Sequence, residues 1–202
     1  MQAPQWYTRD VSRETSEALA AYADLLRRWT TKINLISKST VDELESRHIW
    51  DSAQCYSGQT GRWMDLGSGG GLPAVVVAVL AKGEGNDLST ICVESDLRKA
   101  TFLRTCARDL KIRLSVLDRR IDMIPKNPSD TVSARALADL DKLIGMAEPH
   151  LNPDGMCVFM KGATWKQEID AAQRNWRFSY EAEPSNTDAN AAILRIRGIE
   201  RV

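Results

Sequence analysis

The chain of 202 residues is long enough for one full-size hydrophobic core and a small accessory region. Its 27 basic and 27 acidic side chains balance, which argues against a general nucleic-acid binder but not against a local basic patch. No apolar run approaches membrane-span length, and the four cysteines lack metal-ligand or redox spacing, so we expect a cytoplasmic protein without membrane contact or metal.

The sequence pattern of the N-terminal part of the chain predicts helices and no strands. Apolar residues recur at helical spacing over residues 14–30, and residues 40–56 predict a second helix with Thr40 as a possible N-cap. A turn rich in serine and glycine then precedes the first strand pattern. We therefore expect an N-terminal helical region over residues 1–58 and an α/β domain over residues 59–202.

Strands and helices alternate in the second part, which predicts a parallel, doubly wound sheet. The expected strands span residues 63–66, 90–94, 113–117, 131–134, 156–161, 177–183 and 191–197. The expected helices span residues 72–82, 97–110, 137–149 and 164–175. The last two strands are joined only by a turn-rich segment, so they should form an antiparallel hairpin. Seven strands ending in a hairpin are characteristic of the Rossmann-like class I methyltransferases that depend on S-adenosylmethionine.

A glycine-rich turn after the first strand predicts a ligand site. Asp65 lies near the end of the strand, and four glycines occur within the five positions from Gly67 to Gly71. Such a turn lets the backbone approach a ligand closely. The dinucleotide fingerprint would need a glycine at Leu72, and no Lys-Ser or Lys-Thr pair follows as in a phosphate loop. Asp65 would repel phosphates and attract a cation, so S-adenosylmethionine fits the turn better, although a glycine-rich turn alone is weak evidence.

Glu94 ends the next expected strand and completes the predicted site. In this fold an acidic residue at that place accepts hydrogen bonds from ribose hydroxyls. The alternative is a solvated carboxylate at a strand end. Because Glu94 follows the glycine turn at the right separation, the ribose role is favoured.

Several short motifs, in order along nearly the whole chain, carry a family resemblance. They are W-T-T-K-I-N-L at 29–35, R-H-I-W-D-S at 47–52, D-L-G-S-G-G-G-L-P at 65–73, the three pairs E-S at 94–95, R-K at 98–99 and F-L at 102–103, A-R-A at 134–136 and M-K-G at 160–162. Together they are similar to the motifs of the RsmG family, also called GidB. This resemblance implies methyl transfer from S-adenosylmethionine to N7 of a guanosine, guanine-527, in 16S ribosomal RNA of the small subunit, by a protein that we expect to be a monomer.

The fold pattern and the resemblance together assign the cofactor site. Arg120 and Ile121 follow the third strand, where such enzymes cradle adenine, although Arg120 could be a solvated charge. Arg135 follows the fourth strand, where the target base must arrive, and is the catalytic candidate. Its alternative is a surface ion pair with Asp139. The full expected cofactor set is Asp65, Gly67, Ser68, Gly69, Leu72, Glu94, Arg120, Ile121 and Arg135.

The implied chemistry needs no general base, because N7 of guanine carries no proton. His48 is therefore expected to have a structural or RNA-contacting role. Lys161 should contact RNA phosphate or a neighbouring carboxylate, and the basic residues of the helical region form either an RNA patch or a solvated helix face. The expected RNA contacts are Arg27, Arg28, Lys32, Arg47 and Lys161.

Two other functions remain open from the sequence. One is a methyltransferase that acts on another RNA, a protein or a small molecule. The other is an RNA-binding module with a degenerate cofactor site, which the intact acidic and glycine positions of the turn argue against.

Overall fold

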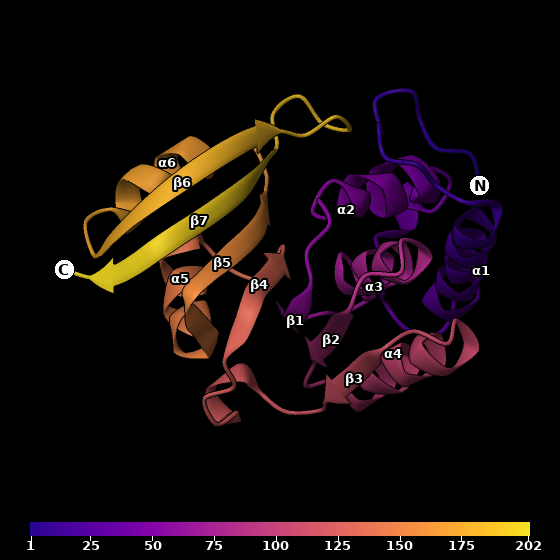
Figure 1. The fold of residues 1–202 in the computed structure, drawn as a ribbon, viewed down its shortest axis with the longest axis horizontal. Helices are drawn as coiled ribbons and strands as arrows, with labels where there is room; N and C mark the ends of the chain where they lie inside the picture. Colours follow the sequence, from indigo (N-terminus) through magenta and orange to yellow (C-terminus); the bar gives the residue numbers. More distant parts are fainter.

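A single seven-stranded sheet runs through the structure, a computed structural model that describes residues 1–202 (Figure 1). Its strands are β1 (Gly61–Leu66), β2 (Leu88–Val93), β3 (Leu114–Leu117), β4 (Ser129–Arg135), β5 (Leu151–Lys161), β6 (Trp176–Pro184) and β7 (Ala192–Arg201). They are ordered β3-β2-β1-β4-β5-β7-β6. Strands β1 to β5 are parallel, and β7 pairs antiparallel with both β5 and β6. The expected parallel sheet with its terminal hairpin is confirmed.

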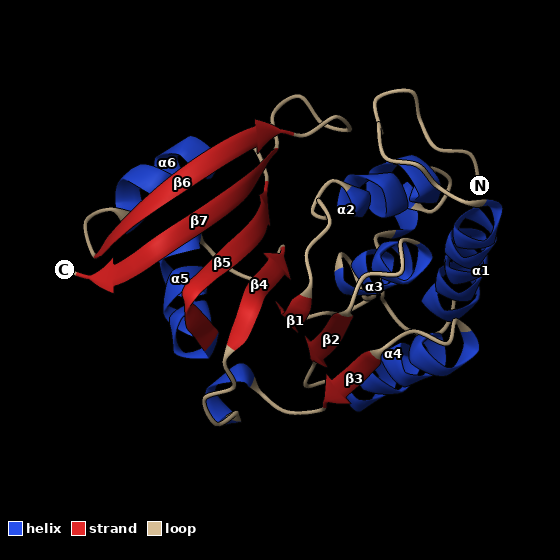
Figure 2. Ribbon diagram, viewed as in Figure 1, coloured by secondary structure: helices blue, strands red, loops and turns tan.

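The helices cover both faces of this sheet (Figure 2). They are α1 (Arg13–Thr30), α2 (Asp51–Ala53), α3 (Ala74–Gly83), α4 (Leu97–Asp109), α5 (Leu140–Ala147) and α6 (Trp165–Ala172). Polar side chains cap three of the N-termini, because Ser12, Asp96 and Asp139 accept hydrogen bonds from the free N–H groups of α1, α4 and α5. None of the helices combines the length and the apolar character needed to span a bilayer.

Successive side chains of a strand point to opposite faces of the sheet, so the hydrophobic core has two layers. In β5, Met156, Val158 and Met160 face one layer, and Cys157 and Phe159 face the other. The first layer contains 33 buried residues from α1, α2, α3, α4 and the sheet, and the second contains 17 from α5, α6 and the sheet. The helical region over residues 1–58 therefore shares its core with the α/β part.

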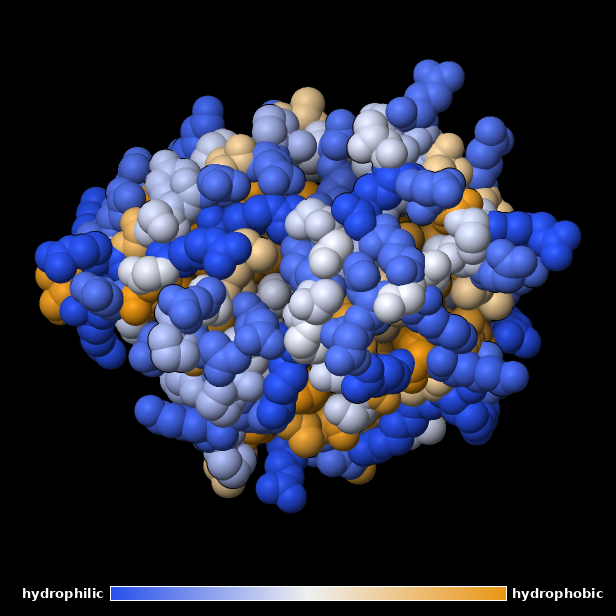
Figure 3. Space-filling model, viewed as in Figure 1, coloured by the Kyte–Doolittle hydropathy of each residue, from blue (hydrophilic) through white to orange (hydrophobic).

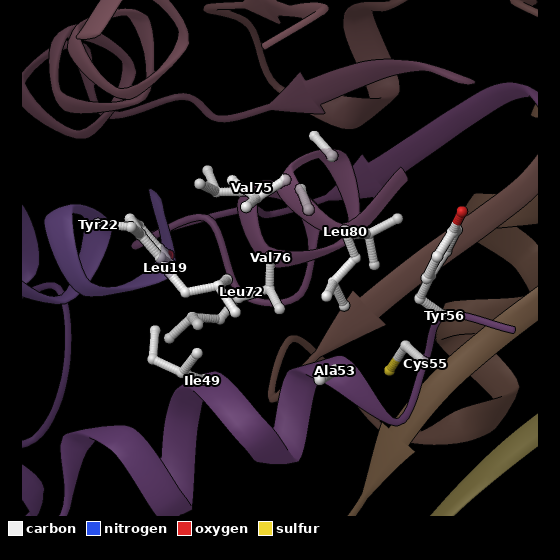
Figure 4. Packing of buried hydrophobic residues seen from close by; sticks show 14 of the residues in the cluster. Leu19, Tyr22, Ile49, Ala53, Cys55, Tyr56, Leu72, Val75, Val76 and Leu80 are labelled. Carbon is white, nitrogen blue, oxygen red and sulfur yellow. The ribbon is translucent and has the colours of Figure 1, made fainter. Parts of the chain in front are cut away.

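Close packing joins the N-terminal region to α3 (Figure 4). Leu19 and Tyr22 of α1 are fully buried in the same cluster as Val75 and Val76 of α3, and Ile49 joins them from the segment before α2. These contacts place the N-terminal segments over the α3 side of the sheet. They also bring residues 36–54 toward the edge where the parallel strands end.

The helix expected over residues 40–56 is found only over residues 44–53, so its bounds and its regular α-helical form are wrong. The chain instead forms a 3-10 turn at Lys38–Thr40, a π-helical turn at Glu45–Trp50 and the short α2. Thr40 caps no helix, because its hydroxyl donates to the Ser37 carbonyl at 2.9 Å and contacts His48 Nε2 at 2.7 Å. Side chains of this segment bind the end of β4, and such tertiary contacts override helical periodicity.

Candidate active site

The loop between β1 and α3 folds tightly over the end of β1. The Ser68 N–H donates to the Val93 carbonyl at 3.0 Å, and the Tyr22 hydroxyl donates to the Gly70 carbonyl at 2.5 Å. The loop is thus fixed to β2 on one side and to α1 on the other. This anchoring presents the backbone of the loop to the space above the strand ends.

Two glycines of this loop have different surroundings. Gly69 and Gly71 have φ of 52° and 81°, a region that favours glycine. A Cβ on Gly71 would lie 2.5 Å from Val75 Cγ2, inside the core. A Cβ on Gly69 would meet only the Gly67 carbonyl oxygen, at 3.8 Å. Gly71 is therefore required by packing, whereas Gly69 leaves an open space at the surface of the loop.

Glu94 is held beside that open space. Its Oε2 accepts the Gly69 N–H at 2.9 Å, and its Oε1 accepts the Asp96 N–H at 2.8 Å. The side chain is buried, at the end of β2. Each carboxylate oxygen keeps a further lone pair with which to accept a hydroxyl group.

A cavity of about 690 Å³ opens in front of these groups. The connection from β3 to β4 contains only a 3-10 turn, Ile121–Met123, so no helix covers this part of the sheet. Six of the expected site residues line the cavity: Gly67, Gly69, Glu94, Arg120, Ile121 and Arg135. The other lining residues were not assigned to the cofactor site from the sequence, although Lys99 and Ala136 belong to the family motifs; they include Lys99, Arg119, Ile124, Ala136, Leu137, Met146 and His150.

Asp65 lies behind the loop and outside the cavity lining. Its Oδ1 accepts the Ser133 hydroxyl at 2.6 Å, and Ser133 in turn accepts the indole N–H of Trp63 at 2.7 Å. Its Oδ2 is buried without a hydrogen-bond partner. Burial raises the pKa of Asp65 to about 7, although the hydroxyls of Ser133 and Ser68 favour the ionised form.

Two further expected cofactor residues also lie off the cavity. Leu72 packs in the core beside Ile49 (Figure 4). Ser68 is buried, and its hydroxyl donates to the Asp65 carbonyl at 2.9 Å. Direct contacts from Asp65, Ser68 and Leu72 to a cofactor stay predictions, whereas the structure shows these three residues shaping the loop.

Arg135 extends from the end of β4 toward the N-terminal segment. Its Nη2 donates to the Arg47 carbonyl at 3.2 Å and contacts His48 Nδ1 at 2.9 Å. Its Nη1 is 3.5 Å from the Ser52 hydroxyl, and the Asp51 carboxylate is 3.8 Å from Nη2. Asp139, the alternative partner for Arg135 considered from the sequence, forms an ion pair with Lys142 instead.

His48 is a neutral side chain in this cluster. Burial, followed by the charges of Arg135 and Arg47, lowers the pKa of His48 to about 4. The ring therefore carries no charge near neutral pH. It is held between Thr40 and Arg135, which agrees with the structural role expected from the sequence.

A second cavity of about 330 Å³ lies on the other side of Arg135. Arg135 and Ala136 line both cavities. The rest of its wall comes from α2 and the segment before it, the ends of β4 and β5, α6, and the loop between β6 and β7 with the start of β7. Ala136 has a φ of 50°, a sparsely populated conformation for a residue with a Cβ, and such strain is often found at functional sites.

Lys161 forms a buried ion pair at the end of β5. Its Nζ lies 2.6 Å from Glu168 Oε2 and donates to the Ala138 carbonyl at 2.8 Å. Glu168 also accepts the Leu140 N–H at 2.9 Å. Of the two partners expected for Lys161, the structure shows the carboxylate, and a contact with RNA stays a prediction.

The basic residues of the helical region lie on the surface. Arg27 pairs with Asp24 at 3.0 Å and Glu45 at 3.4 Å, and Arg47 is 3.6 Å from Glu43. Arg28 and Lys32 are exposed. Hydrophilic side chains dominate the face in Figure 3, with hydrophobic residues mostly in the gaps between them. The contact of these cations with RNA stays a prediction. The structure contains no group of three or more His, Cys, Asp or Glu side chains that could hold a metal ion.

The strand order, the glycine loop at β1 and the carboxylate at β2 define a class I, Rossmann-like methyltransferase fold. Solved structures agree at the level of the fold. The crystal structure of M. jannaschii TYW2 in complex with AdoMet matches with a TM-score of 0.60 and 13% identity over 86% of this chain and 80% of its own. A SAM-dependent methyltransferase from Aquifex aeolicus matches with a TM-score of 0.57 and 11% identity over 81% of this chain and 93% of its own.

Sequence comparison identifies the family within this class. The model of the family described as rRNA small subunit methyltransferase G matches residues 15–194. Ribosomal RNA small subunit methyltransferase G of Ruegeria sp. (strain TM1040) is 47% identical over 96% of this chain and 95% of its own length. The chain belongs to the rRNA small subunit methyltransferase G family.

Proposed function

We propose that the protein transfers a methyl group from S-adenosylmethionine to N7 of a guanosine in 16S ribosomal RNA. Family membership supports a ribosomal RNA methyltransferase. The observation that carries the finer proposal is the placement of Arg135 and Ala136 between two cavities at the carboxyl edge of the sheet. One cavity suits the cofactor and the other suits a target base, as Rossmann-like folds bind ligands at this edge.

The larger cavity has the groups that S-adenosylmethionine needs. The open space at Gly69 admits a ligand against the backbone, and the lone pairs of Glu94 can accept the ribose hydroxyls. Ile121 and Ile124 give an apolar surface for adenine. In its ionised form, which a pKa of about 7 leaves partly populated near neutral pH, the Asp65 carboxylate behind the loop favours a cationic ligand over an anionic one. When bound, this cofactor supplies an electrophilic methyl group.

The smaller cavity provides the surroundings for the guanine. N7 has a free lone pair and no proton, so the reaction requires positioning of the base within about 3–3.5 Å rather than proton removal. The Arg135 guanidinium can donate hydrogen bonds to the edge of the base or to a carboxylate. His48 is neutral and its ring nitrogens are both engaged, which agrees with a reaction that uses no general base.

The substrate proposed here is the RNA within small-subunit particles. The formal net charge is zero, so the surface gives little general attraction for nucleic acid. A protein of this kind would recognise a shaped RNA target better than a free strand. We propose that it acts as a monomer in the cytoplasm, without a metal ion.

Mass mapping of methylated guanosine in 16S ribosomal RNA tests the proposal. Particles from cells without the protein should gain N7-methylguanosine when incubated with it and S-adenosylmethionine, at the position 527 that the family resemblance implies. Arg135→Lys should slow the transfer and leave the fold intact, because Lys lacks the planar fork of donors. Equal turnover on free guanosine, or methylation of another substrate class only, would contradict the proposal.

A further inference from the structure

The guanidinium of Arg135 is held by acceptors from one short segment of the chain. The Arg47 carbonyl and His48 Nδ1 both accept from Nη2, at 3.2 Å and 2.9 Å. Ser52 and Asp51 follow one turn later, at 3.5 Å and 3.8 Å. The side chain of Arg135 is only 22% exposed, so its direction is set by these contacts rather than by water.

The hydrogen bonds around His48 permit only one protonation state. Arg135 has donors and no acceptor, so Nδ1 must carry a lone pair. The proton of the Thr40 hydroxyl is donated to the Ser37 carbonyl, so Thr40 must accept from His48 Nε2. His48 is therefore neutral, with its proton on Nε2.

This tautomer matters for the place of Arg135 between the two cavities. Either a charged imidazole or the opposite tautomer would turn an N–H toward the guanidinium and repel it. The Arg47 carbonyl at 3.2 Å would then be the only short contact, since Ser52 and Asp51 lie 3.5 Å and 3.8 Å away, and one short hydrogen bond fixes the direction of a planar group less firmly than two. A shift of about 1 Å at a reacting centre can lower a rate by about 10²-fold.

We propose that His48 is a positioning residue, which directs the Arg135 guanidinium into the site through the lone pair on Nδ1. This inference rests on the proposed function, because that function places Arg135 beside the reacting groups. It assigns the N-terminal segment a part in the reaction geometry. His48 itself exchanges no proton and contacts no reacting atom.

Two substitutions of similar size separate positioning from a general structural role. In His48→Asn the amide oxygen can replace Nδ1 as the acceptor for Arg135, while the contact with Thr40 is lost. In His48→Gln the amide can replace Nε2 beside Thr40, while the acceptor for Arg135 is lost. We expect His48→Asn to keep kcat within about threefold of the wild type and His48→Gln to lower it by roughly ten- to hundredfold, with KM for small-subunit particles nearly constant.

Equal kcat values for the two variants, whether both high or both low, would overturn the proposal. A second measurement does not depend on activity. The chain has two histidines, His48 and His150, so nitrogen NMR of histidine-labelled protein is simple to assign with His150→Gln. We expect an unprotonated Nδ1 and a protonated Nε2 for His48 at neutral pH. A protonated Nδ1 would overturn the positioning role, whereas a wild type without N7 activity would contradict only the proposed function.

Discussion

Gly69 and Gly71 should respond very differently to the same substitution, although only one residue separates them. Gly69→Ala places a methyl group in open space, where the nearest protein atom is the Gly67 carbonyl oxygen at 3.8 Å. The cost to folding is then the positive φ of 52° alone, about 1–2 kcal/mol. The same methyl group would occupy space against which the cofactor is proposed to lie. We expect Gly69→Ala to fold and to bind S-adenosylmethionine at least tenfold more weakly.

Gly71→Ala is the matched control. Its methyl group would lie 2.5 Å from Val75 Cγ2 and 3.0 Å from Leu103 Cδ2, both fully buried side chains. Overpacking of about 1–3 kcal/mol adds to a similar backbone strain, so the total is about 2–5 kcal/mol. We expect this variant to lose stability first, and to lose affinity only because part of the protein is unfolded.

Urea unfolding and isothermal calorimetry measure the two effects separately. The midpoint of unfolding should fall more for Gly71→Ala than for Gly69→Ala, and the affinity of the folded fraction should fall more for Gly69→Ala. Wild-type affinity in a folded Gly69→Ala protein would refute the cofactor position. Equal loss of stability in both variants would refute the open space at Gly69.

Further substitutions test the buried titratable groups. Burial raises the pKa of Asp65 from 3.8 to about 7, so the unfolding free energy should fall as pH rises between these values, and Asp65→Asn should remove that slope in urea titrations. His48 has its pKa lowered from 6.5 to about 4, so the unfolding free energy should fall as pH drops across that range, and less so in His48→Asn. Lys161→Met should cost about 3–5 kcal/mol by leaving Glu168 unpaired, with partial recovery on adding Glu168→Gln. An unchanged Tm with a raised KM for RNA would instead favour an RNA contact for Lys161.

The sheet could be predicted from the sequence because its signals are local. Most strands contain a short apolar run or an alternation of apolar and polar residues, and the absence of a helix between the last two strands indicated the hairpin. The predicted strand boundaries were less exact where pairing with a neighbouring strand sets the length of a strand. For example, β5 begins at Leu151 rather than at 156, because it continues past an irregularity in its pairing with β4.

The start of α5 shows a different limit. The expected helix over residues 137–149 begins only at Leu140, where the Asp139 side chain accepts the Lys142 N–H. The preceding residues form a bend that begins at Ala136, which has a positive φ, and Leu137 lines the larger cavity. Apolar periodicity could not distinguish a side chain that faces a cavity from one that faces the core.

The part of the site that joins distant segments could not be predicted. Glu94 and Gly69 were found because each lies at a strand end, where the fold itself brings them together. The partners of Arg135 lie 83–88 residues earlier, on a π-helical turn and the short helix that follows. The family motif at residues 47–52 covers these partners, but the motif alone did not indicate a contact with Arg135. We expected it to form part of a regular helix.

The charges around Arg135 have a direct consequence for the proposed methylation at N7. The proposed product is a guanine ring with a positive charge, formed beside a guanidinium that is already positive. A protonated His48 would add a third cation to this cluster, whereas burial and the charge of Arg135 keep it neutral by lowering its pKa to about 4. Asp51, whose carboxylate is 3.8 Å from Arg135, supplies the opposing charge. The same burial that makes His48 a weak base therefore limits repulsion of the product.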